Sequence, residues 1–269
     1  MQKQFFNPEP RIFAHRGISS EYPENSMPAF KKAVEIQSDV IETDIHFTKD
    51  RKFVVFHDET LDRMTNGTGK VTSFTLQELK TFDTGYNFTI DGTTYPYRGK
   101  NLTFLSLDEL LEEFPEQRFN IDLKDKNTSQ VPFYCETIMR HNAQHRVLTA
   151  SNYRRNLTAV RKTIPEMATS AGLWEAIGIF FLFRAGLLFT RKQFSMDALQ
   201  IPEFIGTSRI VSEVFVRLMQ EKGLRVHVWT VNKEEDMKRL IGLGVDAVMS
   251  DYPALLQKVY ETIDRDRNS

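Results

Sequence analysis

Short apolar runs rich in β-branched residues alternate with longer stretches of helical periodicity along most of this chain. Nine such runs predict strands, at residues 11–15, 39–46, 52–57, 118–124, 146–151, 166–171, 196–201, 225–231 and 245–250. Apolar positions at helical spacing predict helices at residues 27–36, 105–113, 153–164, 212–222, 233–243 and 254–262. Strands that alternate with helices in this way indicate parallel βα units.

One predicted strand departs from this order. The connection from residue 46 to residue 52 is too short for a helical crossover, so strands 39–46 and 52–57 are expected to pair in an antiparallel hairpin. Eight strands remain, the number that closes a (β/α)8 TIM barrel. The pattern alone also permits an open, doubly wound α/β sheet, although no glycine-rich dinucleotide or P-loop motif supports one. If the hairpin turn centres on Asp50 and Arg51, Asp44 lies opposite His57.

Residues 58–103 break the alternation of strands and helices. Turn-forming and polar residues dominate there, and only residues 76–82 predict a short helix. We interpret this stretch as a small insertion after the early hairpin. The whole chain, 1–269, is then expected to form one domain, close to the length of about 250 residues that α/β barrels usually have.

Carboxylates gather on one face of the second predicted strand. Glu42 and Asp44 point the same way because alternate side chains share a face, about 6.5–7 Å apart along the strand. Two carboxylates at this spacing can bracket Mg²⁺ or Ca²⁺. The alternative is a solvated sheet edge with ordinary surface acids, but the flanking Val40, Ile41 and Ile45 favour a buried strand.

Two histidines end apolar runs and carry charged neighbours. His15 precedes Arg16, and His57 precedes Asp58. An imidazole can move protons near neutral pH, so the pair suggests acid/base chemistry, while a structural role in the core or at a cap is the alternative. His46 is an intermediate case because it shares the face of the two carboxylates.

Two later strands add further candidates. Asn120, Asp122 and Lys124 share one face of their strand. Asp122 and Lys124 can form a structural ion pair, or they can supply a third metal carboxylate and an ammonium group for a phosphate. Trp229 is either a core aromatic residue or an apolar wall beside the reacting group. The residues alone leave both questions open.

Composition narrows the class of protein. Apolar residues make up 41% of the chain and charged residues 26%, with 35 Lys and Arg against 36 Asp and Glu. This balance gives no basic excess for a nucleic-acid partner. Cys135 is the only cysteine, so an intrachain disulfide and a cysteine metal cluster are excluded. The first residues do not read as a signal peptide, and we expect a cytoplasmic location.

The most apolar segment runs from Leu173 to Phe189. It has 17 residues and contains Glu175 and Arg184, whereas a membrane-spanning helix needs about 20 apolar residues without central charges. We therefore expect no transmembrane helix here. A barrel helix, a dimer contact, and contact with an acyl chain or a membrane surface remain as alternatives.

Seven ordered motifs resemble those of the glycerophosphodiester phosphodiesterase (GDPD) family. They are AHRG (14–17), PENS (23–26), IETDIHFTKD (41–50), VVFHDETLDRMTNGTG (54–69), NIDLK (120–124), VHVWTVN (226–232) and GVDAVMSDYP (244–253). Together they cover nearly the whole chain. Ser26 stands where the family usually has Thr, which keeps the hydroxyl. The resemblance implies a (β/α)8 barrel that hydrolyses glycerophosphodiesters to an alcohol and glycerol 3-phosphate.

The resemblance also implies the reactive groups. His15 and His57 correspond to the acid/base pair of the family. Glu42, Asp44 and Asp122 correspond to the ligands of one divalent cation, Mg²⁺ or Ca²⁺. The family usually has Glu at the position of Asp122, so this carboxylate is one methylene shorter and is expected to reach the ion less directly.

Five further residues take supporting roles by the same resemblance. Arg16 and Lys124 correspond to phosphate contacts, and Trp229 corresponds to a wall of the substrate pocket. Glu24 and Asn25 are expected to support the metal ligands or the substrate hydroxyls.

The resemblance leaves two rival functions. One is lysophospholipase D activity, in which the segment from Leu173 to Phe189 contacts the acyl chain of a lysophospholipid. The other is a barrel that has lost activity and only binds phosphorylated ligands. The retained residues of the site argue against it: His15, His57, Glu42 and Asp44. In each case the expected partner is a small phosphate ester, and no nucleic acid is expected.

Overall fold

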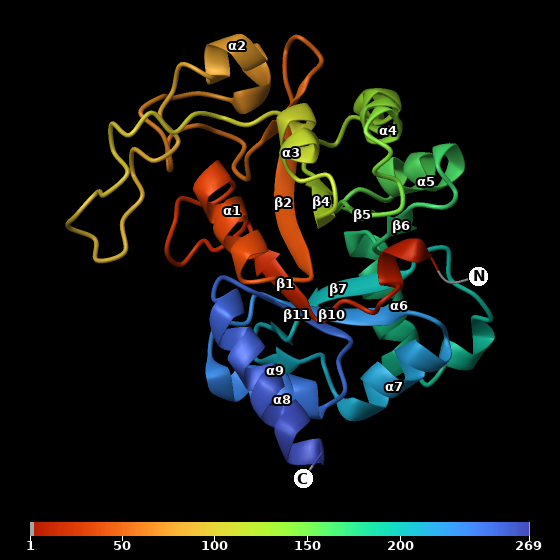
Figure 1. Cartoon of the computed structure of the whole chain (residues 1–269). Helices are drawn as coiled ribbons and strands as arrows, with labels where there is room; N and C mark the ends of the chain where they lie inside the picture. The colour runs from red at the N-terminus through yellow and green to blue at the C-terminus, as the bar shows by residue number, and fades with distance from the viewer. Residues whose placement is uncertain (1–2, 269) are drawn as a thin grey trace.

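The computed structural model of the chain describes residues 3–268, and Figure 1 shows a sheet curled around a central axis with helices outside it. The strands of the main sheet are β1 (Ile12–His15), β2 (Val40–Phe47), β3 (Phe53–Val55), β4 (Arg118–Leu123), β5 (Val147–Ala150), β6 (Ala168–Thr169), β7 (Ala198–Pro202), β10 (Arg225–Trp229) and β11 (Ala247–Ser250). A separate two-stranded hairpin, β8 (Phe204–Ile205) with β9 (Ser208–Arg209), follows β7.

Eight of these strands run parallel in the order β6-β5-β4-β2-β1-β11-β10-β7. The ninth, β3, pairs only with β2 and runs antiparallel to it. The two end strands also approach each other. Ser170, directly after β6, forms a parallel bridge with Ala198 of β7. The sheet is thus a nearly closed (β/α)8 barrel, which confirms the predicted fold class and rules out the open doubly wound sheet.

Helices cover the outside of the barrel. They are α1 (Met27–Glu35), α2 (Leu76–Leu79), α3 (Leu107–Glu113), α4 (Val131–Arg140), α5 (Arg154–Thr163), α6 (Leu173–Arg184), α7 (Glu213–Glu221), α8 (Glu234–Gly242) and α9 (Pro253–Asn268). Serine N-caps fix where three of these helices begin. Ser26 and Ser212 accept hydrogen bonds at the start of α1 and α7, and Ser106 forms a capping box with Glu109 at the start of α3. None of the helices that the structure describes is long and apolar enough to cross a membrane.

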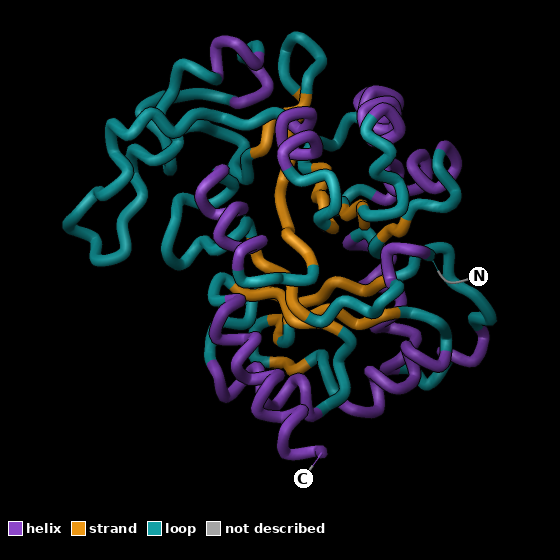
Figure 2. Tube along the Cα trace, viewed as in Figure 1, coloured by secondary structure: helices purple, strands orange, loops and turns teal. Residues whose placement is uncertain are grey.

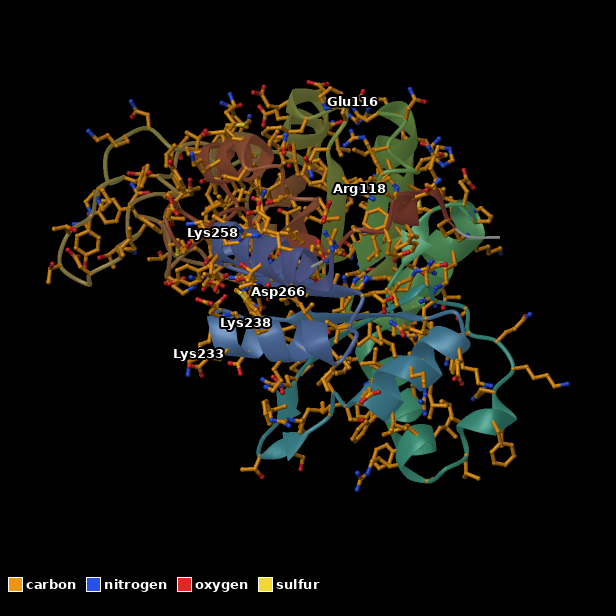
Figure 3. All side chains as sticks on the ribbon, turned by 60° about the horizontal axis from the view of Figure 1, so that its bottom comes forward. Glu116, Arg118, Lys233, Lys238, Lys258 and Asp266 are labelled. Carbon is orange, nitrogen blue, oxygen red and sulfur yellow. The ribbon has the colours of Figure 1, made fainter. Side chains whose placement is uncertain are left out.

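Three apolar clusters hold the barrel together. One lies between the sheet and α1, α3, α4 and α5, and a second lies between the sheet and the helices from α6 to α9. The third fills the barrel, where Phe5 and Phe6 of the first turn pack against the starts of several strands. α8 and α9 are neighbours on the outside; Figure 3 marks Lys233 and Lys238 at the first and Lys258 on the second.

The register of the β2–β3 hairpin differs from the prediction by one residue. His46 pairs with Val54 and Ile45 with Val55, which places Phe56, not His57, opposite Asp44. The cause is a three-residue connection, in which Arg51 adopts a positive φ of 60° and the Thr48 N–H donates to the Lys52 carbonyl. The predicted cross-strand pair is therefore wrong, and another route must bring Asp44 and His57 together.

Residues 58–103 leave the barrel as a mostly irregular segment, visible at the upper left of Figures 1 and 2. The expected helix at 76–82 is shorter and ends at Leu79, after a capping box between Thr75 and Glu78. A small apolar cluster holds the segment against the hairpin, with members Val54, Phe56, Leu61, Met64, Val71, Leu79, Phe88 and Phe104. The segment is thus anchored by its own core.

Candidate active site

A cavity of about 280 Å³ opens at the carboxyl ends of the barrel strands. Eight of the ten residues singled out in the sequence line it: His15, Arg16, Glu42, Asp44, His57, Asp122, Lys124 and Trp229. Trp229 is 43% exposed, so its alternative assignment as a core residue is wrong. The other two residues lie just outside: Asn25 is buried beside Asp44, and Glu24 lines an adjoining cavity.

The end of β1 turns sharply to bring two of these residues into the cavity. Arg16 and Gly17 both have positive φ, 56° and 82°. A Cβ atom at position 17 would lie 2.7 Å from the backbone of Ala29 in α1, so only glycine fits this turn. The Arg16 backbone N–H donates to Glu42 at 3.1 Å, which fixes the turn against β2.

His15 is held by a carboxylate that the sequence analysis did not single out. Its Nδ1 lies 2.6 Å from an oxygen of Asp251, which follows β11. Asp251 also accepts hydrogen bonds from the Ser19 hydroxyl at 2.8 Å and the Asn232 amide at 2.6 Å. An imidazole bound in this way turns its Nε2 away from Asp251, and this nitrogen lies 3.9 Å from Glu42 at the cavity. The signal in the sequence was an acid directly after a buried strand, inside the GVDAVMSDYP motif.

His57 has a similar arrangement. Its Nδ1 lies 2.7 Å from Asp58, and its backbone carbonyl lies 3.2 Å from Nε2 of the buried His46. The other ring nitrogen of His46 lies 2.9 Å from Asp125. His46, the intermediate case in the sequence, thus braces the backbone of His57 without lining the cavity.

The two histidines differ in pKa. Burial lowers the pKa of His15, but the hydrogen bond to Asp251 and the charge of Glu42 outweigh it, so the pKa of His15 is raised. Burial also lowers the pKa of His57; Asp44 opposes this, but the charges of Arg16 and Lys124 add to it, and the net pKa is lowered. Near neutral pH His15 is therefore the more protonated of the two and can act as the proton donor, whereas His57 is the more neutral and can act as the proton acceptor.

The carboxylates of β2 are buried, so the alternative of a solvated edge is wrong. Asp44 lies 2.8 Å from the Lys124 ammonium and 3.3 Å from the Arg16 guanidinium, and it accepts a hydrogen bond from Asn25 at 3.0 Å. Although burial opposes them, these cations hold the pKa of Asp44 well below its usual range. Burial and the charge of Asp44 raise the pKa of Glu42 to about 7.

Four oxygen-bearing side chains form a patch across two neighbouring strands. In the ladder between β2 and β4, Glu42 pairs with Asn120 and Asp44 pairs with Asp122. Asn120 is 1% exposed, and its side-chain oxygen has no hydrogen-bond partner within the described part of the chain. Lys124 bridges Asp44 and Asp122 at 2.8 Å each. Hard oxygen donors, an incompletely compensated carboxylate and an unpaired amide oxygen fit a hard divalent cation.

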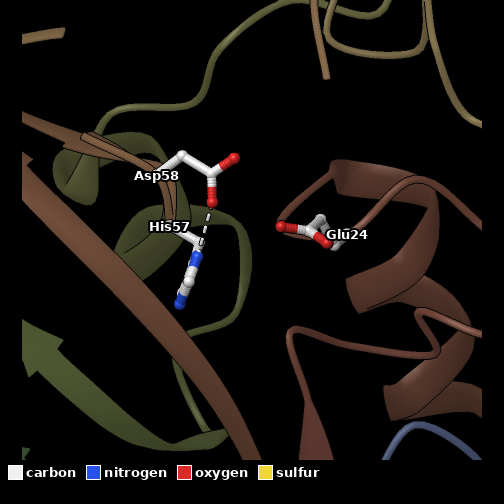
Figure 4. Close-up of side chains that lie close together, drawn as sticks. All are labelled: Glu24, His57 and Asp58. Atoms are coloured by element: carbon white, nitrogen blue, oxygen red, sulfur yellow. Dashed lines mark hydrogen bonds and ion pairs between the residues drawn. The ribbon is translucent and has the colours of Figure 1, made fainter. Parts of the chain in front are cut away.

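A second acidic cluster lies at the rim. One ligand atom from each of Glu24, His57 and Asp58 lies within 4.8 Å of the others, and Figure 4 shows Glu24 facing the hydrogen-bonded His57–Asp58 pair. The Arg63 guanidinium contacts both carboxylates, Asp58 at 2.5 Å and Glu24 at 2.6 Å. Arg16 contacts Glu24 as well, at 3.0 Å. Two guanidinium groups already compensate these acids, whereas in the patch on β2 and β4 Glu42 forms no ion pair with a Lys or Arg of the described residues. This difference favours that patch as the cation site.

An adjoining cavity of about 350 Å³ shares His15 and Arg16 with the first. Its apolar wall comes from Phe88 and Ile90 of the 58–103 segment and from Tyr252 after β11. No residue from Leu173 to Phe189 is among those that line either cavity. The wall could not be predicted from the sequence, because nothing in the segment indicates which of its apolar residues turn towards the barrel.

Comparison with known proteins gives the site a context. The sequence profile of the Glycerophosphoryl diester phosphodiesterase family matches residues 15–255. The chain is 33% identical over 253 residues to a glycerophosphodiester phosphodiesterase of Caldanaerobacter subterraneus subsp. tengcongensis, with 91% of this chain and 95% of that protein covered. It is 28% identical over 264 residues to a human lysophospholipase D, with 91% and 84% covered.

A solved structure is similar over the full length. A phosphodiesterase of Oleispira antarctica, in complex with the product sn-glycerol-3-phosphate, superposes with a TM-score of 0.78 at 25% identity. The match covers 97% of this chain and 100% of that one.

Proposed function

The chain belongs to the glycerophosphoryl diester phosphodiesterase family, and on that premise we propose that it hydrolyses glycerophosphodiesters to an alcohol and glycerol 3-phosphate. The observation that carries the proposal is the pair of histidines at one cavity, each bound to a carboxylate through Nδ1. Such a pair can take a proton from an attacking hydroxyl and return one to a leaving alcohol. As a phosphoric diester hydrolase the protein needs both steps.

The difference in pKa assigns the two steps. His57, with its lowered pKa, is neutral near pH 7 and takes the proton of the attacking hydroxyl at Nε2. His15, with its raised pKa, carries a proton at Nε2 and donates it to the leaving alkoxide oxygen. Asp251 and Asp58 keep each ring in the orientation and tautomer that these transfers require.

We assign the divalent cation, Mg²⁺ or Ca²⁺, to Glu42, Asp44 and Asp122, with the unpaired oxygen of Asn120 beside them. When bound, it would offset the charge of the phosphodiester and polarise its oxygens. Lys124 and Asn25 position Asp44 from two sides. This support holds the carboxylate in one orientation at the cavity wall.

The remaining residues bind and orient the substrate in this proposal. Arg16 and Lys124 are cations at the cavity wall and are suited to contact phosphate oxygens. Glu24 orients the Arg16 guanidinium through its 3.0 Å contact. Trp229, half-exposed at the cavity, offers an apolar surface to the glycerol carbons.

Turnover of glycerophosphocholine tests the proposed function directly. We expect release of choline and glycerol 3-phosphate in equal amounts, each measured by an enzyme-coupled assay. Release of choline phosphate, or no turnover with either cation added, would contradict it.

Asp251→Asn is expected to change the pH dependence of this reaction. A raised folded-state pKa keeps His15 protonated to higher pH, and activity is lost as the pH rises through that pKa. Without the Asp251 charge, the high-pH limb of kcat/KM should move to lower pH, with a loss of about tenfold or more above neutral pH. The profile is measured from about pH 5 to 9. Asp264→Asn, at a surface ion pair with Arg11, is the matched control. Identical profiles would exclude the role of Asp251.

A second candidate function is lysophospholipase D activity. The adjoining cavity favours it, because Phe88, Ile90 and Tyr252 form an apolar wall beside His15 and Arg16 where an acyl chain could lie. The segment from Leu173 to Phe189, which the sequence predicts for this contact, lies outside both cavities. We therefore assign any acyl contact within the site to the 58–103 segment.

The variant Ile90→Ser separates the two functions, because Ile90 is exposed and is not part of the apolar cluster that anchors the segment. If lysophospholipids are substrates, the variant should lose about tenfold in kcat/KM for lysophosphatidylcholine, because removing one apolar side chain from a chain-binding wall costs about 1–2 kcal/mol. Turnover of glycerophosphocholine should hardly change. Negligible turnover of lysophosphatidylcholine by the unaltered protein would rule out the second function.

Three sequence-based expectations remain predictions. The assignment of residues 58–103 as an insertion in one catalytic domain rests on their irregular structure and their own apolar cluster. A cytoplasmic location and the lack of a nucleic-acid partner rest on the sequence alone.

A further inference from the structure

Helix α6 (Leu173–Arg184) has apolar residues on all sides. A helix of this composition is normally buried on all sides. Here only one face is covered: Ile179, Phe180 and Phe183 pack into the cluster under α6 to α9, and Phe183 contacts Phe215 of α7 edge-on. The opposite face is exposed.

The exposed face forms an aromatic stripe, which we define as Trp174, Phe181 and Phe189. These side chains are 74%, 68% and 73% exposed. Trp174 and Phe181 are seven residues apart and therefore lie on one side of the helix, about 10 Å apart along its axis. Phe189 follows in the short turn Leu188–Thr190 after the helix. Large aromatic side chains this exposed, two on one face of the helix and a third just after it, mark an interaction surface.

Basic residues surround the stripe. A cavity of about 570 Å³ beside α6 is lined by Trp174, Arg154 and Arg191 together. Lys192 adjoins Arg191, and Arg184 lies one turn after Phe181; all four cations are exposed.

The local charge is opposite in sign to that of the chain. Residues 154–196 contain seven Lys and Arg against two Glu, whereas the whole chain has a net charge of −1. Of the two acids, Glu175 has a side chain that is only 9% exposed and that contacts Arg161 and Arg154. The exposed surface around the stripe is therefore strongly positive.

The combination of apolar and basic residues decides between two occupants. A second copy of the chain seated on the stripe through a twofold axis would bring Arg184, Arg191 and Lys192 close to their own counterparts, at an electrostatic cost. A bilayer with anionic lipids fits both the aromatic and the basic residues. Aromatic side chains enter the membrane interface, while Lys and Arg contact the anionic head groups.

We propose that α6 and the turn after it dock this protein on the surface of an anionic lipid bilayer, with Trp174, Phe181 and Phe189 in the interface. The helix starts directly after Ser170 and Ala171, which line the active-site cavity. Docking would thus hold the cavity near the source of lipid-derived substrates. The proposal concerns binding alone and does not rest on the proposed hydrolysis.

Vesicle co-sedimentation tests the proposal. The full chain should sediment with vesicles of phosphatidylcholine and phosphatidylglycerol mixed at about two to one, but not with phosphatidylcholine alone. Because the chain has two tryptophans, Trp229→Phe leaves Trp174 as the sole emitter, and its fluorescence should shift to shorter wavelength on the anionic vesicles.

Two variants probe the two components of the surface. Trp174→Ser with Phe181→Ser and Phe189→Ser should abolish sedimentation. Arg191→Glu with Lys192→Glu should weaken it by at least about tenfold, because each basic residue near an anionic surface contributes a factor of about five in affinity. Lys233→Glu with Lys238→Glu, at α8 (Figure 3), is the matched charge control and should bind as the unaltered chain does.

The outcomes are decisive in each direction. Failure to sediment with anionic vesicles, or unchanged sedimentation of the triple variant, overturns the proposal. So does a dimer in sedimentation velocity that the triple variant breaks while vesicle binding is absent, because the stripe would then cover a second copy. Turnover of glycerophosphocholine, which needs no membrane, reports separately on the proposed function and should be unchanged in the triple variant.

Discussion

His15→Ala and His57→Ala are each expected to lower kcat by about 10²- to 10⁴-fold, the usual contribution of a positioned acid or base. Both imidazoles line the cavity, and a carboxylate holds each ring through Nδ1. The measurement is steady-state hydrolysis of glycerophosphocholine at saturating substrate. His145→Ala, at an exposed surface position, is the matched control and should retain full activity. Full activity in either site variant would remove that histidine from the mechanism.

The choice of substrate separates the two roles. An aryl leaving group such as 4-nitrophenolate departs without protonation, so the glycerophosphoryl ester of 4-nitrophenol does not need the general acid. His15→Ala should therefore recover much of its activity on this ester, whereas His57→Ala should not, because it lacks the base for the attacking hydroxyl. The reverse result would exchange the two assignments, and equal losses on both substrates would contradict the division of roles.

The barrel could be predicted from the sequence because its strands and helices are each marked by patterns of neighbouring residues. Seven of the nine main strands fall within a predicted apolar run, and β2 and β7 each extend one residue beyond theirs. The runs are visible because burial on both sides of a parallel strand leaves a continuous apolar stretch. The hairpin between β2 and β3 followed from the length of its connection. α6 was harder, because its apolar residues lie on all sides and give no helical periodicity.

The register of that hairpin shows the limit of local reasoning. A turn of two or of three residues fits the sequence from Thr48 to Lys52, and the choice depends on Arg51 adopting a positive φ. The error of one residue did not mislead the site prediction. Asp44 and His57 still line one cavity.

Most of the site was predictable, but its supports were not. Motif residues at strand ends meet because the carboxyl ends of parallel strands share one end of a barrel. Asp251 holds His15 across 236 positions of sequence, and Arg63 joins Glu24 to Asp58 from the irregular segment. Such contacts depend on tertiary packing that no periodicity reveals. The same holds for the wall formed by Phe88 and Ile90.

Glu42→Gln is expected to have opposite effects on stability and on cation binding. In the metal-free protein, burial and the charge of Asp44 raise the pKa of Glu42 from 4.5 to about 7. The folded state therefore binds this proton more tightly than the unfolded state, and the free energy of unfolding falls as the pH rises from about 4.5 to about 7. Ionising the buried carboxyl thus lowers the free energy of unfolding by about 3 kcal/mol at pH values above about 7. The neutral amide of glutamine avoids this loss. Metal-free Glu42→Gln should thus have a higher Tm than the unaltered protein at mildly alkaline pH.

Cation binding should respond in the reverse direction. Mg²⁺ or Ca²⁺ should raise the Tm of the unaltered protein, because a ligand that binds only the folded state stabilises it. In Glu42→Gln this rise should largely vanish, with affinity lower by about tenfold or more in isothermal titration calorimetry, since even outer partners of metal ligands contribute 10–100-fold. Glu113→Gln, at a surface ion pair with Lys31, is the control and should keep the full rise. A purely structural role for Glu42 would leave cation affinity unchanged, and unaltered affinity would move the ion away from the patch on β2 and β4.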